Sequence, residues 1–382
     1  MKITIVGMGY VGLANALVLA KNNNVTLYDI DNTKIQNFNN GILPLHEDIF
    51  DKYFSTQDLN IIATNHKDEA YSNANIIYLA LPTNFNETLN SFETSIIDDV
   101  VKDILIFNNK ALIVIKSTVP IGYTELLKQK LNYENIIFCP EFLREDKALT
   151  DCLNPSRIII GGKKKLNEFE SILRKSCSCD DKNIIYTTNT EAESIKLFSN
   201  AYLAMRVSFF NELDTFAYNN NLNVSNIISG ICKDPRIGDY YNNPSFGFGG
   251  YCLPKDTKQI VSQTKNHNNL LTAILKSNQM RKTFISDVIN KSSARIVGVY
   301  KLNMKKGSSN SRNSAILDII NNLNAKVIIY EPTLKENTNS FTIESNLKTF
   351  KEKCDIILVN RISDDLSDVK HKVFTRDIYS RD

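Results

Sequence analysis

The feature that most constrains this sequence is a glycine-rich turn between an apolar strand and a helix at its amino end. Gly7-Met8-Gly9-Tyr10-Val11-Gly12 has the spacing G-x-G-x-x-G and directly follows Ile3-Thr4-Ile5-Val6. Glycines permit a tight turn and the close approach of a pyrophosphate, whose charge is stabilised at the start of the next helix. In this context the pattern predicts a dinucleotide site. The alternative is a glycine turn in an α/β domain that binds no nucleotide.

The order of apolar and helical segments predicts the fold class. Short apolar runs rich in β-branched residues lie at 3–6, 25–28, 76–80, 111–115, 136–138 and 157–160. Helical patterns separate the runs. Continuous apolar runs indicate strands covered on both faces, so the alternation predicts a parallel, doubly wound sheet. The same pattern returns at 296–300, 326–330 and 355–359. We therefore predict an α/β protein with two α/β parts.

The middle of the chain has a different character. Residues 190–217 contain no Gly or Pro and predict one long helix, with Thr190-x-x-Glu193 as a capping box at its start. Residues 270–289 predict a second helix. Between them, residues 234–256 are rich in Gly, Pro, Asn and Tyr, which indicates a functional loop.

Composition excludes several classes of protein. A net charge of +3 with 42% hydrophobic and 23% charged residues is typical of a soluble globular protein and gives no sign of a nucleic-acid or membrane surface. The uncharged stretch between Lys2 and Lys21 is broken by glycines, so we interpret it as a strand and a helix and not as a signal peptide. Seven cysteines without metal spacing predict free thiols in a reducing, cytoplasmic compartment.

Polar residues after the strands extend the predicted cofactor site. Asp29 ends the second strand about twenty residues after the glycines, where an acid bonds a ribose 2′-hydroxyl and repels a 2′-phosphate, so NAD is favoured over NADP. Asp31 is a rival for this role, and Lys34 is either a cofactor contact or a surface lysine. Thr83 and Thr118 follow the carboxyl ends of strands, where open α/β sheets place ligands, although each hydroxyl can equally cap a turn.

The densest chemical signal surrounds one cysteine. Three glycines precede Cys252 in the run 247–256, and Lys255 and Asp256 follow it within one helical turn. A nearby cation favours the nucleophilic thiolate, so we predict a reactive thiol. The bland alternative, a small buried apolar residue, fits most cysteines but not this neighbourhood.

Two further pairs have i,i+4 spacing. Lys196 and Asn200 share a helix face and can direct a cation and an amide at an oxygen that becomes negative, or Lys196 can simply extend to solvent. Glu141 and Glu145 follow a predicted strand and can supply a general base, or form a solvated helix start.

These residues together resemble the UDP-glucose/GDP-mannose dehydrogenase family over essentially the whole chain. The motifs that carry the resemblance are G-x-G-Y-V-G at 7–12, K-S-T at 116–118, P-E-F-L-R-E at 140–145, E-x-x-K-L-F-x-N at 193–200, F-x-N-E-L at 209–213, D-x-R-I-G at 234–238, G-G-Y-C-L-P-K-D at 249–256 and T-R-D at 375–377. The cysteine motif is highly specific. The sequence departs from the family at Cys139, where Ser is more common, and around residues 303 and 311.

The resemblance implies three domains and a four-electron oxidation. The domains would be an NAD-binding Rossmann domain at 1–188, a central helical dimerisation domain with the cysteine loop at 189–290, and a UDP-sugar-binding α/β domain at 291–382. It implies that the C6 alcohol of UDP-glucose is oxidised to the carboxylate in two hydride transfers to NAD, without release of the aldehyde. A covalent thiol adduct retains the aldehyde between the two transfers, and this explains a cysteine that ordinary alcohol oxidation does not need.

The resemblance also implies roles for single residues. Cys252 would be the nucleophile, Lys196 and Asn200 would stabilise the oxyanion, and Asp256 and Thr118 would hold a water. Glu141 would be the base for hydrolysis, with Glu145 supporting the site. Cofactor contacts would come from Gly7, Gly9, Tyr10, Val11, Gly12, Asp29, Lys34, Thr83, Thr118, Glu145, Lys255 and Arg312. Substrate contacts would come from Glu141, Phe142, Leu143, Glu145, Lys196, Asn200, Tyr241, Asn242, Asn243, Ser245, Gly249, Lys305 and, from the partner of a homodimer, Arg236. No metal is implied.

Three alternatives remain open from the sequence. The same chemistry can act on GDP-mannose or UDP-N-acetylmannosamine. A two-electron β-hydroxyacid dehydrogenase would share the Rossmann start and the helical middle, but it would not need Cys252. A non-catalytic NAD-binding redox sensor would not need Glu141, Lys196, Asn200 and Asp256 in addition.

Overall fold

The computed structural model describes residues 1–45, 47–162, 166–264, 268–302, 315–331 and 341–380. Two compact units divide the chain, Met1–Phe198 and Ser199–Asp382. In the part of the chain that is described, no helix is long and apolar enough to cross a membrane.

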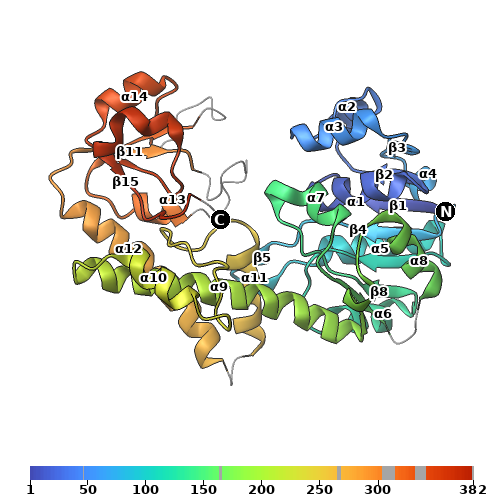
Figure 1. The fold of residues 1–382 in the computed structure, drawn as a ribbon. Helices are drawn as coiled ribbons and strands as arrows, with labels where there is room; N and C mark the ends of the chain where they lie inside the picture. The colour runs from blue at the N-terminus through green and yellow to red at the C-terminus, as the bar shows by residue number, and fades with distance from the viewer. Residues whose placement is uncertain (46, 163–165, 265–267, 303–314, 332–340, 381–382) are drawn as a thin grey trace. The chain divides into compact units, whose positions relative to one another are not determined.

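The first unit is built on a six-stranded parallel sheet with the strand order β3-β2-β1-β4-β7-β8 (Figure 1). The strands are β1 (Lys2–Val6), β2 (Asn24–Tyr28), β3 (Ile61–Thr64), β4 (Ile76–Leu79), β7 (Leu112–Ile115) and β8 (Ile136–Phe138). The order reverses beside β1, between β2 and β4. In open α/β sheets ligands bind at the carboxyl ends of the strands next to such a reversal.

Among the described residues of the first unit, the helices α1 to α8 connect or cover these strands. They are α1 (Tyr10–Ala20), α2 (Asn32–Asn39), α3 (Asp48–Thr56), α4 (Lys67–Tyr71), α5 (Ser95–Phe107), α6 (Tyr123–Leu131), α7 (Ala148–Leu153) and α8 (Asn167–Ser176). In α1 every residue from Gly12 to Ala20 is buried, because α7 and α8 pack on it as well as the sheet. A helix without a solvent face needs no polar side. This explains the uncharged stretch that resembles a signal peptide.

The edges of this unit were predicted less well than its centre. The sequence prediction missed β3, and it took residues 157–160 as one of the last strands of the unit. Residues Ile158–Gly161 do form a strand, β9, but it pairs with β10 (Ile184–Thr187) in a separate two-stranded sheet. A hairpin of β5 (Phe85–Asn86) and β6 (Ser91–Phe92) also stands apart from the main sheet.

The long predicted helix is α9 (Asn189–Asn219), and the boundary between the two units falls within it. The predicted capping box was wrong by two residues. Thr188 and Glu191 form it: the Thr188 N–H donates to Glu191 at 2.8 Å, and the Glu191 N–H donates to the Thr188 hydroxyl at 3.3 Å. The sequence contains T-x-x-E twice in this stretch, and the second glutamate, Glu193, has another task described below.

The second unit continues with three more helices and a second parallel sheet. The helices are α10 (Val224–Cys232), α11 (Cys252–Gln263) and α12 (Asn269–Asn290). The sheet has the order β13-β12-β11-β14-β15, formed by Thr342–Ile343, Lys326–Tyr330, Ile296–Tyr300, Ile356–Leu358 and Val373–Phe374. Helices α13 (Ala315–Ile320) and α14 (Leu347–Lys353) and the 3-10 segment Asp364–Lys372 accompany it. The prediction of an α/β part at each end of a helical middle is confirmed.

Candidate active site

The glycine turn has the geometry that the motif requires. Gly7 has φ +103°, and a Cβ at this position would lie 2.4 Å from the carbonyl oxygen of Ala80. A Cβ on Gly12 would lie 1.8 Å from the carbonyl oxygen of Gly7. Both positions therefore exclude any larger residue, because the turn, the neighbouring strand end and the first turn of α1 lie in contact.

Gly9 is a glycine for a different reason. It has an ordinary negative φ, and a Cβ there would meet no described heavy atom within 4 Å. Gly9 is the N-cap of α1. Within the protein alone a larger residue would fit at Gly9. Its side chain would, however, occupy the space through which a phosphate approaches the helix N-terminus. This open space fits a dinucleotide.

The two candidate acids after β2 have separate tasks. Asp29 accepts the Met8 N–H at 2.8 Å, which places its carboxylate beside the glycine turn. Asp31 instead caps α2 by accepting the N–H groups of Thr33 and Lys34 at 2.9 and 3.3 Å. Lys34 lies 3.9 Å from Asp29 and is about two-fifths exposed. The geometry favours Asp29 as the acid that faces a bound ribose.

The carboxyl ends of β7 and β8 hold a cluster of charges. Lys116 Nζ lies 2.5 Å from Glu141 Oε1 and 3.5 Å from the sulfur of Cys139. Lys196 Nζ, from α9, donates to the carbonyl oxygen of Glu141 at 2.5 Å. Burial lowers the pKa of Lys116, but the groups of Cys139 and Glu141 outweigh it and raise this pKa well above its usual range. Glu141 therefore lies between two lysines.

Lys116 was missed by the sequence analysis. A signal was present, because Lys116 directly follows an apolar strand, at the carboxyl end where open α/β sheets place ligands. Ser117 was missed as well: its hydroxyl accepts the Leu81 N–H at 2.7 Å and so joins the loop after β7 to the loop after β4, which carries Thr83. Thr83 is buried and Thr118 partly exposed.

A pocket of about 310 Å³ lies beside the charged cluster within the first unit. The segment 140–144, which contains three predicted substrate residues, forms part of its lining together with Lys116 and Arg157. The Arg157 guanidinium lies 3.8 Å from the centre of the Phe142 ring. Glu145 starts a 3-10 turn, Glu145–Lys147, whereas Glu141 precedes it in a segment without regular secondary structure. The i,i+4 spacing of the two glutamates thus does not correspond to one helix face.

Glu193 ties α9 to the loop that follows Thr118. Its two carboxylate oxygens accept the N–H groups of Gly122 and Thr124 at 2.5 and 2.8 Å, at the start of α6. Glu193 is fully buried, and this burial raises the pKa of its carboxyl despite the bonds from Thr124 and Gly122. The glutamate three residues before Lys196 thus fixes α9 against α6.

Cys252 is the first residue of α11 and is exposed. A thiolate at a helix N-terminus is stabilised by the helix dipole and by nearby cations. Lys255 lies in the first turn of the same helix and pairs with Asp256 at 2.9 Å. Burial lowers the pKa of Lys255, but Asp256 and the Cys252 thiol raise it more, so the pKa lies above its ordinary value. The lysine is therefore a cation at neutral pH in the same helical turn as the thiol.

Asn200 of α9 completes this group in the second unit. Its amide Nδ2 lies 2.5 Å from Oδ2 of Asp256, and Asp256 has no exposed surface. The structure thus brings Asn200, Asp256, Lys255 and Cys252 together in one unit, and Lys196, Glu141 and the loop of Thr118 together in the other.

The predicted substrate segment 241–249 is held by side chains that the sequence analysis did not identify. Asn278 of α12 pairs through both its amide oxygen and nitrogen with the backbone of Phe248, at 2.8 and 2.9 Å. Asn243 donates to Asp377 at 2.7 Å, and Asn242 donates to the sulfur of Cys232 at 3.3 Å. The segment is mostly buried, although its residues follow no regular secondary structure.

Arg236 has an exposed side chain, with 87% of its surface accessible, and pairs with Asp234 at 2.6 Å. Arg206 of α9 fixes the loop next to it by donating to the carbonyl oxygens of Tyr240, Ile237 and Gly238 at 2.8, 3.1 and 3.3 Å. Two predicted residues, Lys305 and Arg312, lie outside the described residues.

Family models match three successive parts of the chain. Residues 1–175 match the NAD binding domain of the UDP-glucose/GDP-mannose dehydrogenase family, residues 190–280 its central domain and residues 298–380 its UDP binding domain. The chain belongs to the UDP-glucose/GDP-mannose dehydrogenase family. The predictions of the family, of the fold class and of NAD as the cofactor are thereby confirmed.

Members of the family resemble this chain along its whole length. It is 49% identical over 392 residues to the UDP-glucose 6-dehydrogenase of Campylobacter jejuni, with 100% of both chains covered. It is 41% identical over 394 residues to the UDP-glucose 6-dehydrogenase of Streptococcus pneumoniae, again with full coverage of both. The solved UDP-glucose dehydrogenase of Pyrobaculum islandicum has a TM-score of 0.88 at 22% identity, covering 99% of this chain and 94% of that one, and shares the fold.

Proposed function

We propose that this protein is a UDP-glucose 6-dehydrogenase. It converts UDP-glucose, two NAD⁺ and one water into UDP-glucuronate, two NADH and three protons. The full-length similarity to two relatives that carry this name supports the substrate. GDP-mannose and UDP-N-acetylmannosamine are the other nucleotide sugars that the same chemistry would suit.

The proposal rests mainly on the residues that surround Cys252. The thiol is exposed at the first residue of a helix, with the buried Lys255–Asp256 pair in the same helical turn and the Asn200 amide on that carboxylate. A two-electron dehydrogenase needs no activated thiol. A four-electron oxidation does, because the aldehyde must stay bound between the two oxidations.

The catalytic roles are assigned to residues of both units. NAD, when bound, accepts the hydride in each oxidation. Cys252 attacks C6 of the aldehyde and forms a thiohemiacetal, which is oxidised to a thioester and then hydrolysed by water. Lys196 and Asn200 stabilise negative charge on the C6 oxygen. Asp256 and Thr118 hold a water, and Glu141 accepts the proton of the water that attacks the thioester.

Binding is assigned to the remaining residues of the two units. The glycine turn with Tyr10 and Val11 holds the pyrophosphate, and Asp29 accepts from the ribose hydroxyls. Lys34, Thr83, Glu145, Lys255 and Arg312 are further cofactor contacts. The nucleotide sugar is bound by Phe142, Leu143, Tyr241, Asn242, Asn243, Ser245, Gly249 and Lys305.

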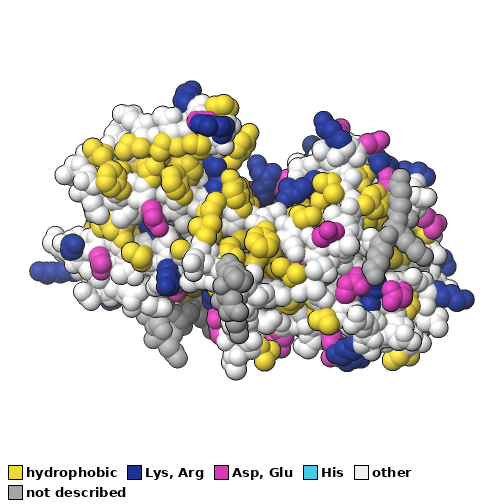
Figure 2. Space-filling model, turned by 90° about the horizontal axis from the view of Figure 1, so that it is seen from below, with side chains coloured by type: hydrophobic (Ala, Val, Ile, Leu, Met, Phe, Trp, Pro, Cys, Tyr) yellow, Lys and Arg dark blue, Asp and Glu magenta, His cyan; other side chains and the backbone are white. Residues whose placement is uncertain are grey.

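We also propose a homodimer through the central helices, with Arg236 reaching the active site of the partner. Tyr202, Phe209 and Phe216 are spaced seven residues apart on α9 and are each more than half exposed. Figure 2 shows one face of the molecule, on which hydrophobic side chains gather in several patches. Aromatic residues are enriched in protein interfaces. The division into domains at 1–188, 189–290 and 291–382 is part of this proposal.

A reducing, cytoplasmic location completes the proposal. All seven cysteines are free, and the proposed nucleophile must remain a thiol.

The first test is the number of NADH molecules formed for each UDP-glucose consumed by the purified protein with excess NAD⁺. Two NADH for each sugar are expected. One NADH would mean that the reaction stops at the aldehyde and that the role of Cys252 is wrong. No NADH from UDP-glucose, but two from GDP-mannose or UDP-N-acetylmannosamine, would retain the chemistry and change the substrate.

The second test is Cys252→Ser, with Cys179→Ser as a control at a partly exposed cysteine outside the proposed site. The Cys252 variant should bind NADH as the wild type does but form no thioester detectable by mass spectrometry of the intact protein. Full turnover by this variant would exclude the covalent mechanism and favour a two-electron dehydrogenase. NAD binding without turnover by the wild type on any nucleotide sugar would favour a redox sensor.

A further inference from the structure

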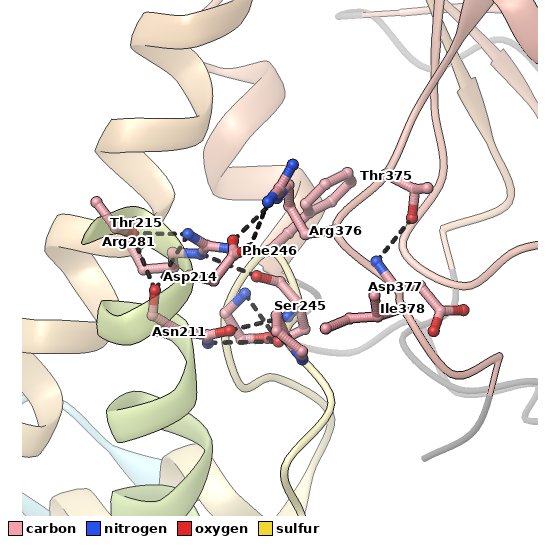
Figure 3. A network of polar contacts seen from close by, with 12 residues as sticks. Asn211, Asp214, Thr215, Ser245, Phe246, Arg281, Thr375, Arg376, Asp377 and Ile378 are labelled. Carbon is pink, nitrogen blue, oxygen red and sulfur yellow. Dashed lines mark hydrogen bonds and ion pairs between the residues drawn. The ribbon is translucent and has the colours of Figure 1, made fainter. Parts of the chain in front are cut away.

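A buried carboxylate in the second unit is shared by two arginines that come from distant parts of the sequence (Figure 3). Asp214 of α9 has no exposed surface. Arg281 Nη2, from α12, lies 2.5 Å from its Oδ2, and Arg376 Nε, after β15, lies 2.9 Å from the same oxygen. Arg376 also donates to the other carboxylate oxygen. Buried charges persist only when they are paired and hydrogen-bonded, so this carboxylate fixes both guanidinium groups.

Arg281 uses its remaining donors to hold the predicted substrate segment. Its Nε donates to the carbonyl oxygen of Ser245 at 2.9 Å, and its Nη1 donates to the Thr215 hydroxyl at 2.7 Å. The N–H of Ser245 in turn donates to Oδ1 of Asn211 at 2.8 Å. Both backbone polar groups of Ser245 are thus bound by side chains of the helices α9 and α12, as Figure 3 shows.

The segment after β15 is hydrogen-bonded to the same loop. Asn243 Nδ2 donates to Asp377 at 2.7 Å, and the N–H of Ile378 donates to the Asn243 oxygen at 3.0 Å. Asp377 directly follows Arg376, which binds Asp214. The loop 243–245 is therefore fixed by α9, by α12 and by residues 376–378, and each of these three elements also carries one member of the Asp214–Arg281–Arg376 cluster.

We infer that Asp214 and Arg281 are positioning residues that set the affinity for the nucleotide sugar. They fix the backbone at Asn243 and Ser245, which are two of the substrate residues assigned above, so the inference rests on the proposed function. The arginine fork binds the Asp214 carboxylate through Nη2 and the Ser245 carbonyl through Nε, whereas a lysine has a single nitrogen for both. A lysine at position 281 can keep the ion pair but must release the loop.

Arg281→Lys is therefore the informative variant, because it keeps the buried charge. We expect the Kd of UDP, measured by calorimetry, and the KM of UDP-glucose to rise about tenfold, as for the loss of one hydrogen bond to a charged group. The Kd of NADH should not change. Arg174→Lys is the matched control, since Arg174 also bridges two acids, Glu170 and Asp181, but in the first unit.

Asn211→Ala is a second variant, which removes the acceptor of the Ser245 N–H and leaves the ion pairs in place. It keeps the inference testable if Arg281→Lys does not fold. It should also raise the Kd of UDP. An unchanged Kd of UDP in both variants, or equal losses for UDP and NADH, would overturn the inference.

Hydrogen exchange of the protein without ligands separates this inference from the proposed function. Amides of residues 243–248 should exchange faster in Arg281→Lys, while those of the strands β11 and β12 exchange as in the wild type. This result is expected even if the wild type does not oxidise UDP-glucose. Unchanged exchange at 243–248 would show that Arg281 does not position the loop, whatever the substrate is.

Discussion

Asn200 Nδ2 lies 2.5 Å from Oδ2 of Asp256, and the other oxygen of this carboxylate faces Lys255 Nζ at 2.9 Å. An amide N–H donor and an ammonium group thus contact the two oxygens of a carboxylate that has no exposed surface. Loss of Asp256 would therefore leave the polar groups of Lys255 and Asn200 without this partner, and loss of either neighbour would leave one carboxylate oxygen without its partner.

Asp256→Asn should therefore destabilise the protein as well as inactivate it. It leaves the buried Lys255 cation without its partner, which costs about 3–5 kcal/mol of unfolding free energy. The double variant Asp256→Asn with Lys255→Met should recover most of the stability but no activity. Urea unfolding of the wild type and of both variants checks this. Equal stability of Asp256→Asn and wild type would mean that the pair is not buried in solution.

Asp29→Ala should relax the preference for NAD over NADP, because it removes the acid beside the glycine turn. Asp31→Ala is a matched control two residues away. It should cost about 1 kcal/mol through the lost cap of α2 and leave the cofactor preference unchanged. The ratio of kcat/KM for the two cofactors measures the preference. If Asp31→Ala changes this ratio and Asp29→Ala does not, the two roles are reversed.

Lys116→Met should lower both stability and turnover. It leaves Glu141, which is mostly buried, without the ammonium group 2.5 Å away, and loss of one partner of a buried ion pair costs about 3–5 kcal/mol. Adding Glu141→Gln should restore stability because no unpaired charge remains. Thermal melting and steady-state turnover of the single and double variants provide the test. A double variant no more stable than Lys116→Met would contradict the pairing.

Alkylation should distinguish Cys252 from Cys177 and Cys354, which are less exposed. Burial raises the pKa of Cys177 and of Cys354 to about 11, so near pH 8 only about 0.1% of either is thiolate. Cys252 is exposed at a helix N-terminus, and iodoacetamide should modify it first, in step with the loss of activity. Labelling of Cys177 and Cys354 should rise about tenfold for each pH unit toward pH 10. Peptide mass spectrometry measures each site, and equal rates at pH 8 would refute the assignment.

Glu193 should make stability depend on pH. Burial raises the pKa of its carboxyl above the ordinary value of 4.5, so the folded state binds the proton more tightly than the unfolded state. The stability that protonation contributes is fully present below about 4.5 and is lost as pH rises through the folded pKa. Relative to Glu193→Gln, the wild type should therefore lose stability from about pH 4.5 upward. Urea midpoints from pH 4 to pH 8 measure this, and parallel curves for the two proteins would disprove it.

The sequence predicted those features that depend on neighbouring residues. The glycine turn, the strands 3–6 and 296–300 and the placement of Cys252 before Lys255 and Asp256 all follow from local spacing. Asp29 and Asp31 show the limit of this approach. Both acids have the right distance from the glycines, and only the observed N–H partners separate a ligand-facing acid from a helix cap.

Features that depend on distant pairing were not predictable. Lys116 and Glu141 are 25 residues apart, and Asp214 and Arg376 are 162 apart, so no local pattern joins them. The capping box was misplaced because T-x-x-E occurs twice within a few residues, and the competing glutamate is used by α6. A local sequence pattern cannot show which of the two glutamates caps α9 and which one bonds the distant helix α6.

The central position of β1 has a consequence for synthesis on the ribosome. This first strand pairs with β4, which ends at Leu79, and the helix that follows β1 is covered by α7 and α8, which end at Leu153 and Ser176. The nascent chain therefore emerges with an apolar helix whose coverings do not yet exist, and chains are synthesised at about 5–20 residues per second. For roughly ten seconds or more this helix is the natural target of a chaperone that binds apolar segments.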